Sequence, residues 1–100
     1  MDDTRTGSPS PTVRDNPERG RYELIVDDHI VSIAEYHLEG SVLVVPHVET
    51  DRAMRGRGMA DRLMRGMLDD IRSRRLTISP LCSFAAGFIR DHPDDADLLA

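Results

Sequence analysis

The most regular hydrophobic pattern in the chain begins after Gly58. Apolar residues recur there at spacings of three and four, with arginine and aspartate between them: Met59, Ala60, Leu63, Met64, Met67, Leu68 and Ile71. This spacing places the apolar side chains on one face of an α-helix and most of the charged ones on the other. The pattern therefore predicts an amphipathic helix of about four turns that starts next to Gly58.

The residues before this helix have the pattern of β-strands. Residues 22–26 and 29–37 are rich in β-branched and aromatic side chains and are separated by two aspartates, which predicts a hairpin. Residues 41–49 begin with an almost unbroken apolar run, which predicts a strand buried on both faces. Because Pro46 lies inside this run and cannot donate to the hydrogen-bond ladder, we expect a bulge or a splay between strands there.

Two shorter elements are predicted after the long helix. Leu76–Ile78 has the pattern of a short strand that Pro80 closes, and Ser83 fits the N-cap of a second helix through Arg90, which stops near Pro93. The predicted order of elements is ββ-β-α-β-α. This order indicates an α+β fold with a mixed, mostly antiparallel sheet and two main helices.

Length and composition indicate one small domain behind a tail. Residues 1–12 carry almost no apolar side chains, so we expect a disordered tail there and a single domain over residues 13–100. The chain is 39% hydrophobic, with four aromatic residues and no Trp, so its core must be mainly aliphatic. The single cysteine excludes an internal disulfide, and the lack of a leader or a long apolar run predicts a cytoplasmic protein without a membrane segment.

Charge is concentrated in one part of the chain. Residues 52–75 hold eight arginines against three aspartates, a local charge of +5, although the whole chain carries −5. An acidic chain with one compact basic segment favours a small polyanionic ligand over a nucleic-acid polymer. Nucleic-acid contact through the same segment is the weaker alternative, because the net charge and the lack of aromatic residues count against it.

The junction between the predicted strand and the long helix is the best candidate for a ligand site. It reads Arg55-Gly56-Arg57-Gly58-Met59-Ala60. Glycines let the backbone turn its N–H groups toward a ligand, and the unpaired N–H groups of a helix start bind anions. The two arginines add full positive charges. Taken alone, the same motif also fits a glycine-rich turn with solvated arginines.

Taken together, the motifs resemble a known family. Arg55, Gly58 and Ala60 form an Arg-x-x-Gly-x-Ala pattern similar to the pyrophosphate-binding signature of the GNAT superfamily of acetyl-CoA-dependent N-acetyltransferases. Further motifs follow in the order found in the minimal, single-domain GNAT-like family: Asn16-Pro17-Glu18-Arg19, Tyr22-Glu23-Leu24, His47-Val48-Glu49, Pro80-Leu81-Cys82-Ser83-Phe84 and Arg90-Asp91-His92-Pro93. The resemblance covers essentially the whole predicted domain.

The resemblance implies a GNAT-like sheet with a splayed, bulged strand, and acetyl-CoA bound in the splay as co-substrate. The residues that it assigns to cofactor binding are Val48, Glu49, Arg55, Gly56, Arg57, Gly58, Met59, Ala60, Ser83 and Phe84. The pyrophosphate would lie on the amides of residues 56–60, and pantetheine would pair with main chain near Val48 and Glu49. The chain would then acetylate an unidentified amine, either a small amine or a basic protein segment.

The resemblance also places the acetyl thioester beside Cys82 and His47. His47 could act as the base, because an imidazole titrates near neutral pH. Cys82 could be a nucleophile that forms an acetyl-cysteine intermediate or a proton donor to the CoA thiolate, with Glu49 as a reserve base acting through water. Taken alone, a cysteine after a strand is usually a small buried hydrophobe, and a histidine beside a bulge is usually a structural hydrogen-bond partner.

One alternative function keeps the same cleft without the reaction. A non-catalytic module that binds CoA or acyl-CoA would need the glycine-rich turn but neither Cys82 nor His47 as a reactive group. The four histidines and the cysteine contain no HxxxH or CxxC spacing, so we expect no metal site.

Overall fold

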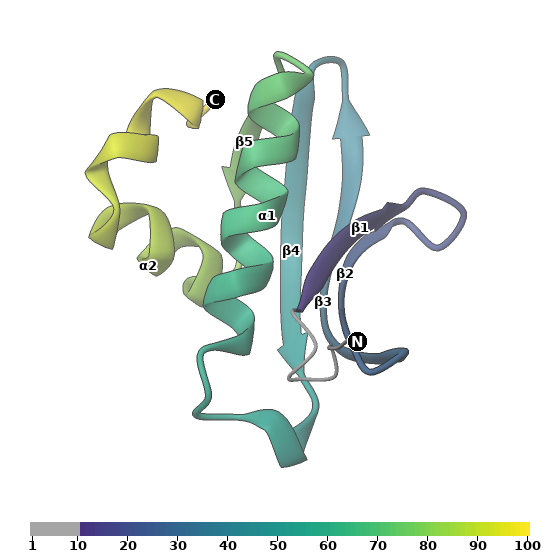
Figure 1. Cartoon of the computed structure of the whole chain (residues 1–100). Helices are drawn as coiled ribbons and strands as arrows, with labels where there is room; N and C mark the ends of the chain where they lie inside the picture. Colours follow the sequence, from purple (N-terminus) through teal and green to yellow (C-terminus); the bar gives the residue numbers. More distant parts are fainter. Residues whose placement is uncertain (1–10) are drawn as a thin grey trace, which may run out of the picture.

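The computed structural model describes residues 11–100, which form a five-stranded sheet with two α-helices (Figure 1). The strands are β1 (Thr12–Asn16), β2 (Arg21–Val26), β3 (His29–Glu39), β4 (Val42–Thr50) and β5 (Thr77–Pro80). The helices are α1 (Met59–Ser73) and α2 (Ser83–Asp91), with the short 3-10 helices η2 (Arg52–Met54) and η3 (Pro93–Leu98).

The strands lie in the order β1-β2-β3-β4-β5, so neighbours in the sheet are also neighbours in sequence. The first four strands are antiparallel, whereas β5 runs parallel to β4. A parallel neighbour needs a crossover connection, and α1 provides it across one face of the sheet (Figure 1). The predicted α+β fold with a mixed, mostly antiparallel sheet is confirmed.

The predicted hairpin is formed by β2 and β3. The two residues of its turn, Asp27 and Asp28, both have left-handed backbone conformations, with φ of 53° and 65°. Two successive positive φ angles are typical of the type I′ turn, whose twist matches that of the flanking strands. β3 continues past the predicted end at His37 to Glu39, and Gly40, with φ of 63°, turns the chain into β4.

β1 is absent from the predicted elements. The predicted tail over residues 1–12 falls mostly on residues 1–10, which lie outside the described residues, but Thr12 already pairs with Ile25 of β2. The side chain of Val13 explains why β1 is ordered, because it packs against the core at the point where α1 carries Gly66. A Cβ atom on Gly66 would lie 2.5 Å from Val13 Cγ2, so the absence of a side chain there lets β1 and α1 meet.

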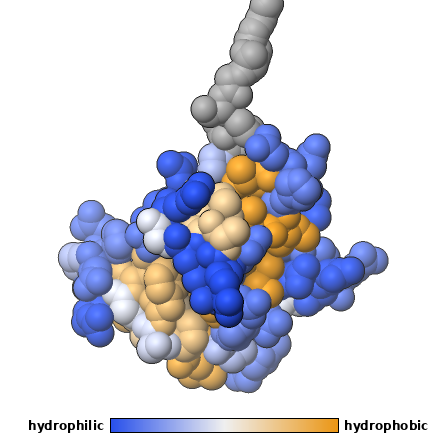
Figure 2. Space-filling view, turned by 90° about the horizontal axis from the view of Figure 1, so that it is seen from below, coloured by the Kyte–Doolittle hydropathy of each residue, from blue (hydrophilic) through white to orange (hydrophobic). Residues whose placement is uncertain are grey.

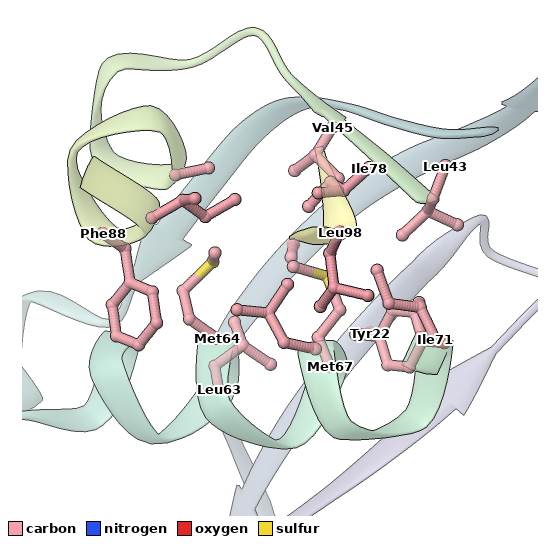
Figure 3. Close-up of a cluster of buried hydrophobic side chains, with 14 of the residues drawn as sticks. Tyr22, Leu43, Val45, Leu63, Met64, Met67, Ile71, Ile78, Phe88 and Leu98 are labelled. Atoms are coloured by element: carbon pink, nitrogen blue, oxygen red, sulfur yellow. The ribbon is translucent and has the colours of Figure 1, made fainter. Parts of the chain in front are cut away.

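The apolar face of α1 lies against the sheet, as its spacing predicts. Leu63, Met64, Met67, Leu68 and Ile71 are fully buried. They join one core cluster with side chains from the sheet, α2 and η3, which include Tyr22, Leu43, Val45, Ile78, Phe88 and Leu98 (Figure 3). Each such side chain stabilises the fold by about 1.5–3 kcal/mol when it is fully buried. The core is thus mainly aliphatic and methionine-rich, as the composition implies.

The start of α2 differs from the prediction. The N-cap is Cys82, whose Sγ accepts a hydrogen bond from the Ala85 N–H at 3.4 Å, so the expected N-cap Ser83 is instead the first helical residue. The reason lies in β4, where the carbonyl of Val45 accepts hydrogen bonds from the N–H groups of both Leu81 and Cys82. These bonds hold Cys82 in the extended conformation that an N-cap residue requires.

Asp95 ties η3 to α1. The residue is 3% exposed, and its carboxylate accepts hydrogen bonds from both terminal nitrogens of Arg65 at 2.8 Å and from Arg72 Nη2 at 3.2 Å. A bidentate arginine is the geometry in which a buried carboxylate is well compensated. Just beyond η3, the N–H of Ala100 donates to the carbonyl of Ile78 at 2.9 Å, so the end of the described chain lies along β5.

Candidate active site

Among the described strands, β4 has a neighbour on both edges in its first half and on only one edge in its second half. Its pairing with β5 ends at Val45, which lies opposite Pro80. On the other edge, Val45 and Pro46 together face the single residue Tyr36 of β3, which is a β-bulge. Beyond this bulge β4 continues to Thr50 whereas β5 has ended, so the two strands splay. The bulge and the splay predicted from Pro46 are both confirmed.

A cavity of about 530 Å³ lies at the end of this splay. It is bounded by the last residues of β4, the loop into α1, the first turn of α1 and one residue of α2. We call it the splay cavity, and its lining residues are His47, Val48, Glu49, Thr50, Met54, Arg55, Gly56, Gly58, Met59, Ala60, Asp61 and Phe84. Figure 2 views the molecule from the end where β4 stops and α1 begins, and hydrophobic surface is exposed there between hydrophilic side chains.

The loop before α1 has a backbone suited to anion binding. Gly56 and Gly58 have φ of 77° and 75°, a region that residues with a Cβ rarely adopt. Gly58 is also the N-cap of α1 and provides no side-chain acceptor for the first turn. The first N–H groups of α1 are therefore left for water or a ligand, and the helix dipole adds positive potential at the same point.

Two charged residues adjust the potential of this loop in opposite directions. Arg55 is anchored to β4, because its Nε donates to the carbonyl of Thr50 at 3.1 Å. Its two terminal nitrogens stay available for a second acceptor. Asp61 lies in the first turn of α1 and lines the splay cavity. Its carboxylate stabilises the helix dipole but repels an anion bound at the same helix start.

His47 and Glu49 form a pair at the mouth of the splay cavity. They lie two residues apart on the same face of β4, and His47 Nε2 is 2.9 Å from Glu49 Oε1. Because a carboxylate only accepts hydrogen bonds, the neutral imidazole carries its proton on Nε2 and leaves Nδ1 as an acceptor. Both side chains are half exposed, so the pair can meet a molecule that arrives from solvent.

Cys82 lies where β4 and β5 separate, but it is not among the lining residues of the splay cavity. Its backbone N–H donates a hydrogen bond to the carbonyl of Val45, which is the last residue of β4 that pairs with β5. Its side chain is partly buried, packs against the core and accepts the bond from Ala85. The thiol therefore stands at the closed end of the splay.

The structure gathers most of the site residues expected from the sequence. Nine line the splay cavity: His47, Val48, Glu49, Arg55, Gly56, Gly58, Met59, Ala60 and Phe84. Arg57, Cys82 and Ser83 do not line it. The sequence-based expectations missed Thr50, Met54 and Asp61. Asp61 could have been found from its place three residues after Gly58, which puts it in the first helical turn; nothing in the sequence marks the other two.

Residues 11–100 contain neither a cluster of metal ligands nor a helix that could cross a membrane. No three His, Cys, Asp or Glu side chains there are grouped in a way that could hold a metal ion. Neither of the described α-helices has the length and apolar character that crossing a membrane requires.

Two solved structures of other proteins have a similar fold. A protein from Staphylococcus aureus described as GCN5-like, solved by NMR in solution, has a TM-score of 0.64 and 14% identity over 89% of this chain and 87% of its own. The ribosomal-protein-S18-alanine N-acetyltransferase from Escherichia coli has a TM-score of 0.61 and 10% identity over 71% of this chain and 49% of its own. At such low identity these two likenesses show the fold alone.

The family itself is shown by a match in sequence. None of the curated proteins compared with the chain matches it. The family model of the GCN5-related N-acetyl-transferases, however, matches residues 21–98, which include β2 to α2 and every residue that lines the splay cavity. The resemblance noted from the sequence motifs is thus confirmed, and the chain belongs to the GCN5-related N-acetyltransferase family.

Proposed function

We propose that this acetyltransferase binds acetyl-CoA in the splay cavity and transfers the acetyl group to an amine that approaches His47. The observation that carries the proposal is the position of the cavity between a glycine-rich helix start and a strand that has lost its neighbour. The first feature fits a pyrophosphate, and the second fits an extended chain with amide groups. CoA combines these two chemical parts in one molecule.

The pyrophosphate is assigned to the loop before α1. The positive φ angles of Gly56 and Gly58 and the uncapped first turn offer backbone N–H groups, which bind phosphate oxygens. Arg55 adds two terminal nitrogens from a side chain that is already fixed on Thr50, and Arg57 adds an exposed charge next to it. A guanidinium matches two phosphate oxygens better than an ammonium group does.

The pantetheine arm is assigned to the edge of β4 that β5 leaves. Beyond Val45 no described strand pairs with that edge, so the main chain at Val48 and Glu49 can exchange hydrogen bonds with the amides of pantetheine. Apolar walls for the methylene groups come from Met59 of α1 and Phe84 of α2, which is 39% exposed although it is a large hydrophobic side chain. Ser83 lies beside Phe84 at the start of the same helix.

The acetyl transfer itself is assigned to His47 and Cys82. His47 Nδ1 accepts a proton from the attacking amine, Glu49 holds the ring through Nε2, and the amine nitrogen forms a bond with the carbonyl carbon of the thioester. The carbon–sulfur bond then breaks, and the CoA thiolate takes a proton. Cys82 serves either as the donor of that proton or as a nucleophile that carries the acetyl group before the amine takes it.

Thermal unfolding with CoA, acetyl-CoA and ADP tests the cofactor site. A ligand that binds only the folded protein raises the melting temperature with its concentration, by several degrees at about a hundred times its Kd. ADP should give a smaller rise, because it contacts only the loop before α1. An unchanged melting temperature at about 1 mM CoA would rule out the site.

Mass spectrometry separates the two roles of Cys82 and tests whether the protein is catalytic at all. After incubation with acetyl-CoA, an acetyl group on Cys82 indicates the nucleophile. An unmodified chain indicates the proton donor if Cys82→Ala transfers acetyl more slowly, and it indicates no catalytic role for Cys82 if the variant transfers acetyl as fast as the parent. Cys82→Ala should transfer acetyl more slowly than the parent with unchanged CoA binding. CoA binding without transfer to any amine of a broad panel would instead identify a binding module.

A further inference from the structure

We propose that Glu35 makes the site selective for acceptors that carry a second positive charge close to the amine that is acetylated. This inference rests on the proposed function, because it takes His47 as the base that meets the acceptor. It goes further by naming the chemical class of the acceptor, a short diamine or another amine with a neighbouring cation.

The register of the sheet brings Glu35 to His47. Glu35 of β3 lies directly opposite His47 of β4, and Ile33 lies opposite Glu49. Residues directly opposite in an antiparallel pair point to the same face, with Cβ atoms about 4.5–5.5 Å apart. Glu35 and His47 are therefore cross-strand neighbours on the face where His47 and Glu49 meet solvent.

The bulge at Pro46 is what creates this pairing. Before the bulge, Val44 lies opposite His37, and after it, His47 lies opposite Glu35, so β4 uses one residue more than β3 over this stretch. Without the extra residue, the alternation of side chains would turn the imidazole to the other face of the sheet. That other face carries the core beneath α1, with Ala34 and Val45 fully buried.

Glu35 differs from the other carboxylates on this face in having no partner. Glu23 is fully buried and receives Arg14 and Arg21, and Glu39 lies 2.9 Å from His37 Nε2. Arg21 lies opposite Glu35 in β2, but its guanidinium pairs with Glu23 through Nε at 2.8 Å and, within residues 11–100, forms no ion pair with Glu35. Among the described residues, Glu35 has neither an ion pair nor a side-chain hydrogen bond, and it is exposed.

An unpaired carboxylate beside the base favours a dication as acceptor. One amine must lose its proton to attack the thioester, so it carries no charge in the reactive complex. A second ammonium group on the same molecule keeps its charge and can pair with Glu35 both in the bound complex and in the transition state, which raises kcat/KM by lowering KM. An amine of equal length without the second charge gains nothing from Glu35.

The test compares 1,4-diaminobutane with 1-aminobutane, which has the same chain and a single nitrogen. Because the diamine offers two equivalent amino groups, its kcat/KM exceeds that of the monoamine even without Glu35. Glu35→Gln should lower the ratio of the two kcat/KM values by up to about fivefold, the size expected of an exposed ion pair, and leave the KM for acetyl-CoA unchanged. Glu39→Gln is the matched control, because it removes a carboxylate from the same strand and face, and it should preserve the ratio.

The outcomes separate this inference from the proposed function. A ratio of the two kcat/KM values that is the same in the parent and in Glu35→Gln overturns the role of Glu35 and leaves the acetyl transfer standing. No transfer to either amine, or to any other amine, overturns the proposed function and the role of Glu35 with it. A ratio lowered equally in both variants shows that the general charge of the face, and not Glu35, selects the acceptor.

Discussion

The imidazole of His47 lies 2.9 Å from the carboxylate of Glu49, and both residues line the splay cavity, just beyond the bulge of β4. One ring nitrogen is thereby occupied, and the other is left to take a proton. Because the two ring nitrogens have different partners, the effects of His47 and Glu49 on catalysis can be measured separately. In the proposed mechanism, His47 acts on the amine directly, and Glu49 acts through the orientation of the ring.

Replacing His47 should therefore cost more than replacing Glu49. We expect His47→Ala to lower kcat about a hundredfold or more at neutral pH, since general-base catalysis contributes about 10²–10⁴. Glu49→Gln should lower kcat only severalfold, because an exposed ion pair is weak and the amide still accepts a hydrogen bond. Steady-state kinetics at several pH values measure both, and equal losses in the two variants would contradict this division of roles.

A side chain at Gly58 should weaken CoA binding. Gly58 has φ of 75°, a conformation that a residue with a Cβ adopts only with strain, and this conformation turns the first N–H groups of α1 outward. The strain is in the backbone alone, because no atom lies within 4 Å of the added Cβ. We expect Gly58→Ala to raise the Kd for CoA about tenfold, measured by calorimetry. Gly40→Ala is the control, because Gly40 has a similar φ of 63° and equally open space in the turn between β3 and β4. It should lower stability and leave the Kd unchanged.

Removing the charge of Asp61 should have the opposite effect on CoA. Its carboxylate lines the splay cavity at the helix start to which the pyrophosphate is assigned. We expect Asp61→Asn to lower the Kd for CoA severalfold at low salt and to lower stability by about 0.3–1 kcal/mol, because the helix dipole loses a compensating charge. Asp69→Asn on the same helix, outside the cavity, should leave the Kd as it is. Weaker CoA binding by Asp61→Asn would place the phosphates elsewhere.

Features with a strong local pattern were predictable from the sequence. The face of α1, the turn at Asp27 and Asp28 and the bulge at Pro46 each depend on residues within a few positions of one another. The glycine-rich loop was found for the same reason, since its positive φ angles and its helix start are adjacent in the chain.

Features that depend on distant partners were not predictable. β1 is ordered because Val13 packs against α1 at Gly66, which has no side chain and lies more than fifty residues away in the sequence. Cys82 replaces Ser83 as the N-cap because its N–H reaches the carbonyl of Val45 in another strand. The place of Thr50 in the site likewise depends on its bond to Arg55, which only the folded loop brings close.

The contact between β1 and α1 leads to a prediction about stability. In Gly66→Ala the new Cβ would lie 2.5 Å from Val13 Cγ2 and 2.6 Å from its Cβ, so the helix or the strand must move. Overpacking of this kind costs about 1–3 kcal/mol, of which the higher helix propensity of alanine offsets about 1 kcal/mol, and urea unfolding would measure the net loss of stability. Gly87→Ala in α2 is the matched control, and it should raise the free energy of unfolding. Its Cβ would meet only the flexible end of Arg90 at 3.2 Å, and alanine favours a helix over glycine by about 1 kcal/mol.

Acid should loosen η3 through Asp95. The bonds from Arg65, helped by those from Arg72, outweigh the burial of the group and hold the pKa of the Asp95 carboxyl below its ordinary value. A carboxyl whose pKa is lower in the folded state adds stability above the unfolded pKa of about 4, and this contribution disappears as the pH falls through the folded pKa. The free energy of unfolding of the parent should therefore fall steeply below about pH 4.

Asp95→Asn should be less stable near pH 7, because it leaves Arg65 without its buried partner, and its unfolding free energy should fall less between pH 5 and pH 2. Urea titrations across this range measure both curves, and parallel curves for the two proteins would show that other carboxylates control the acid transition.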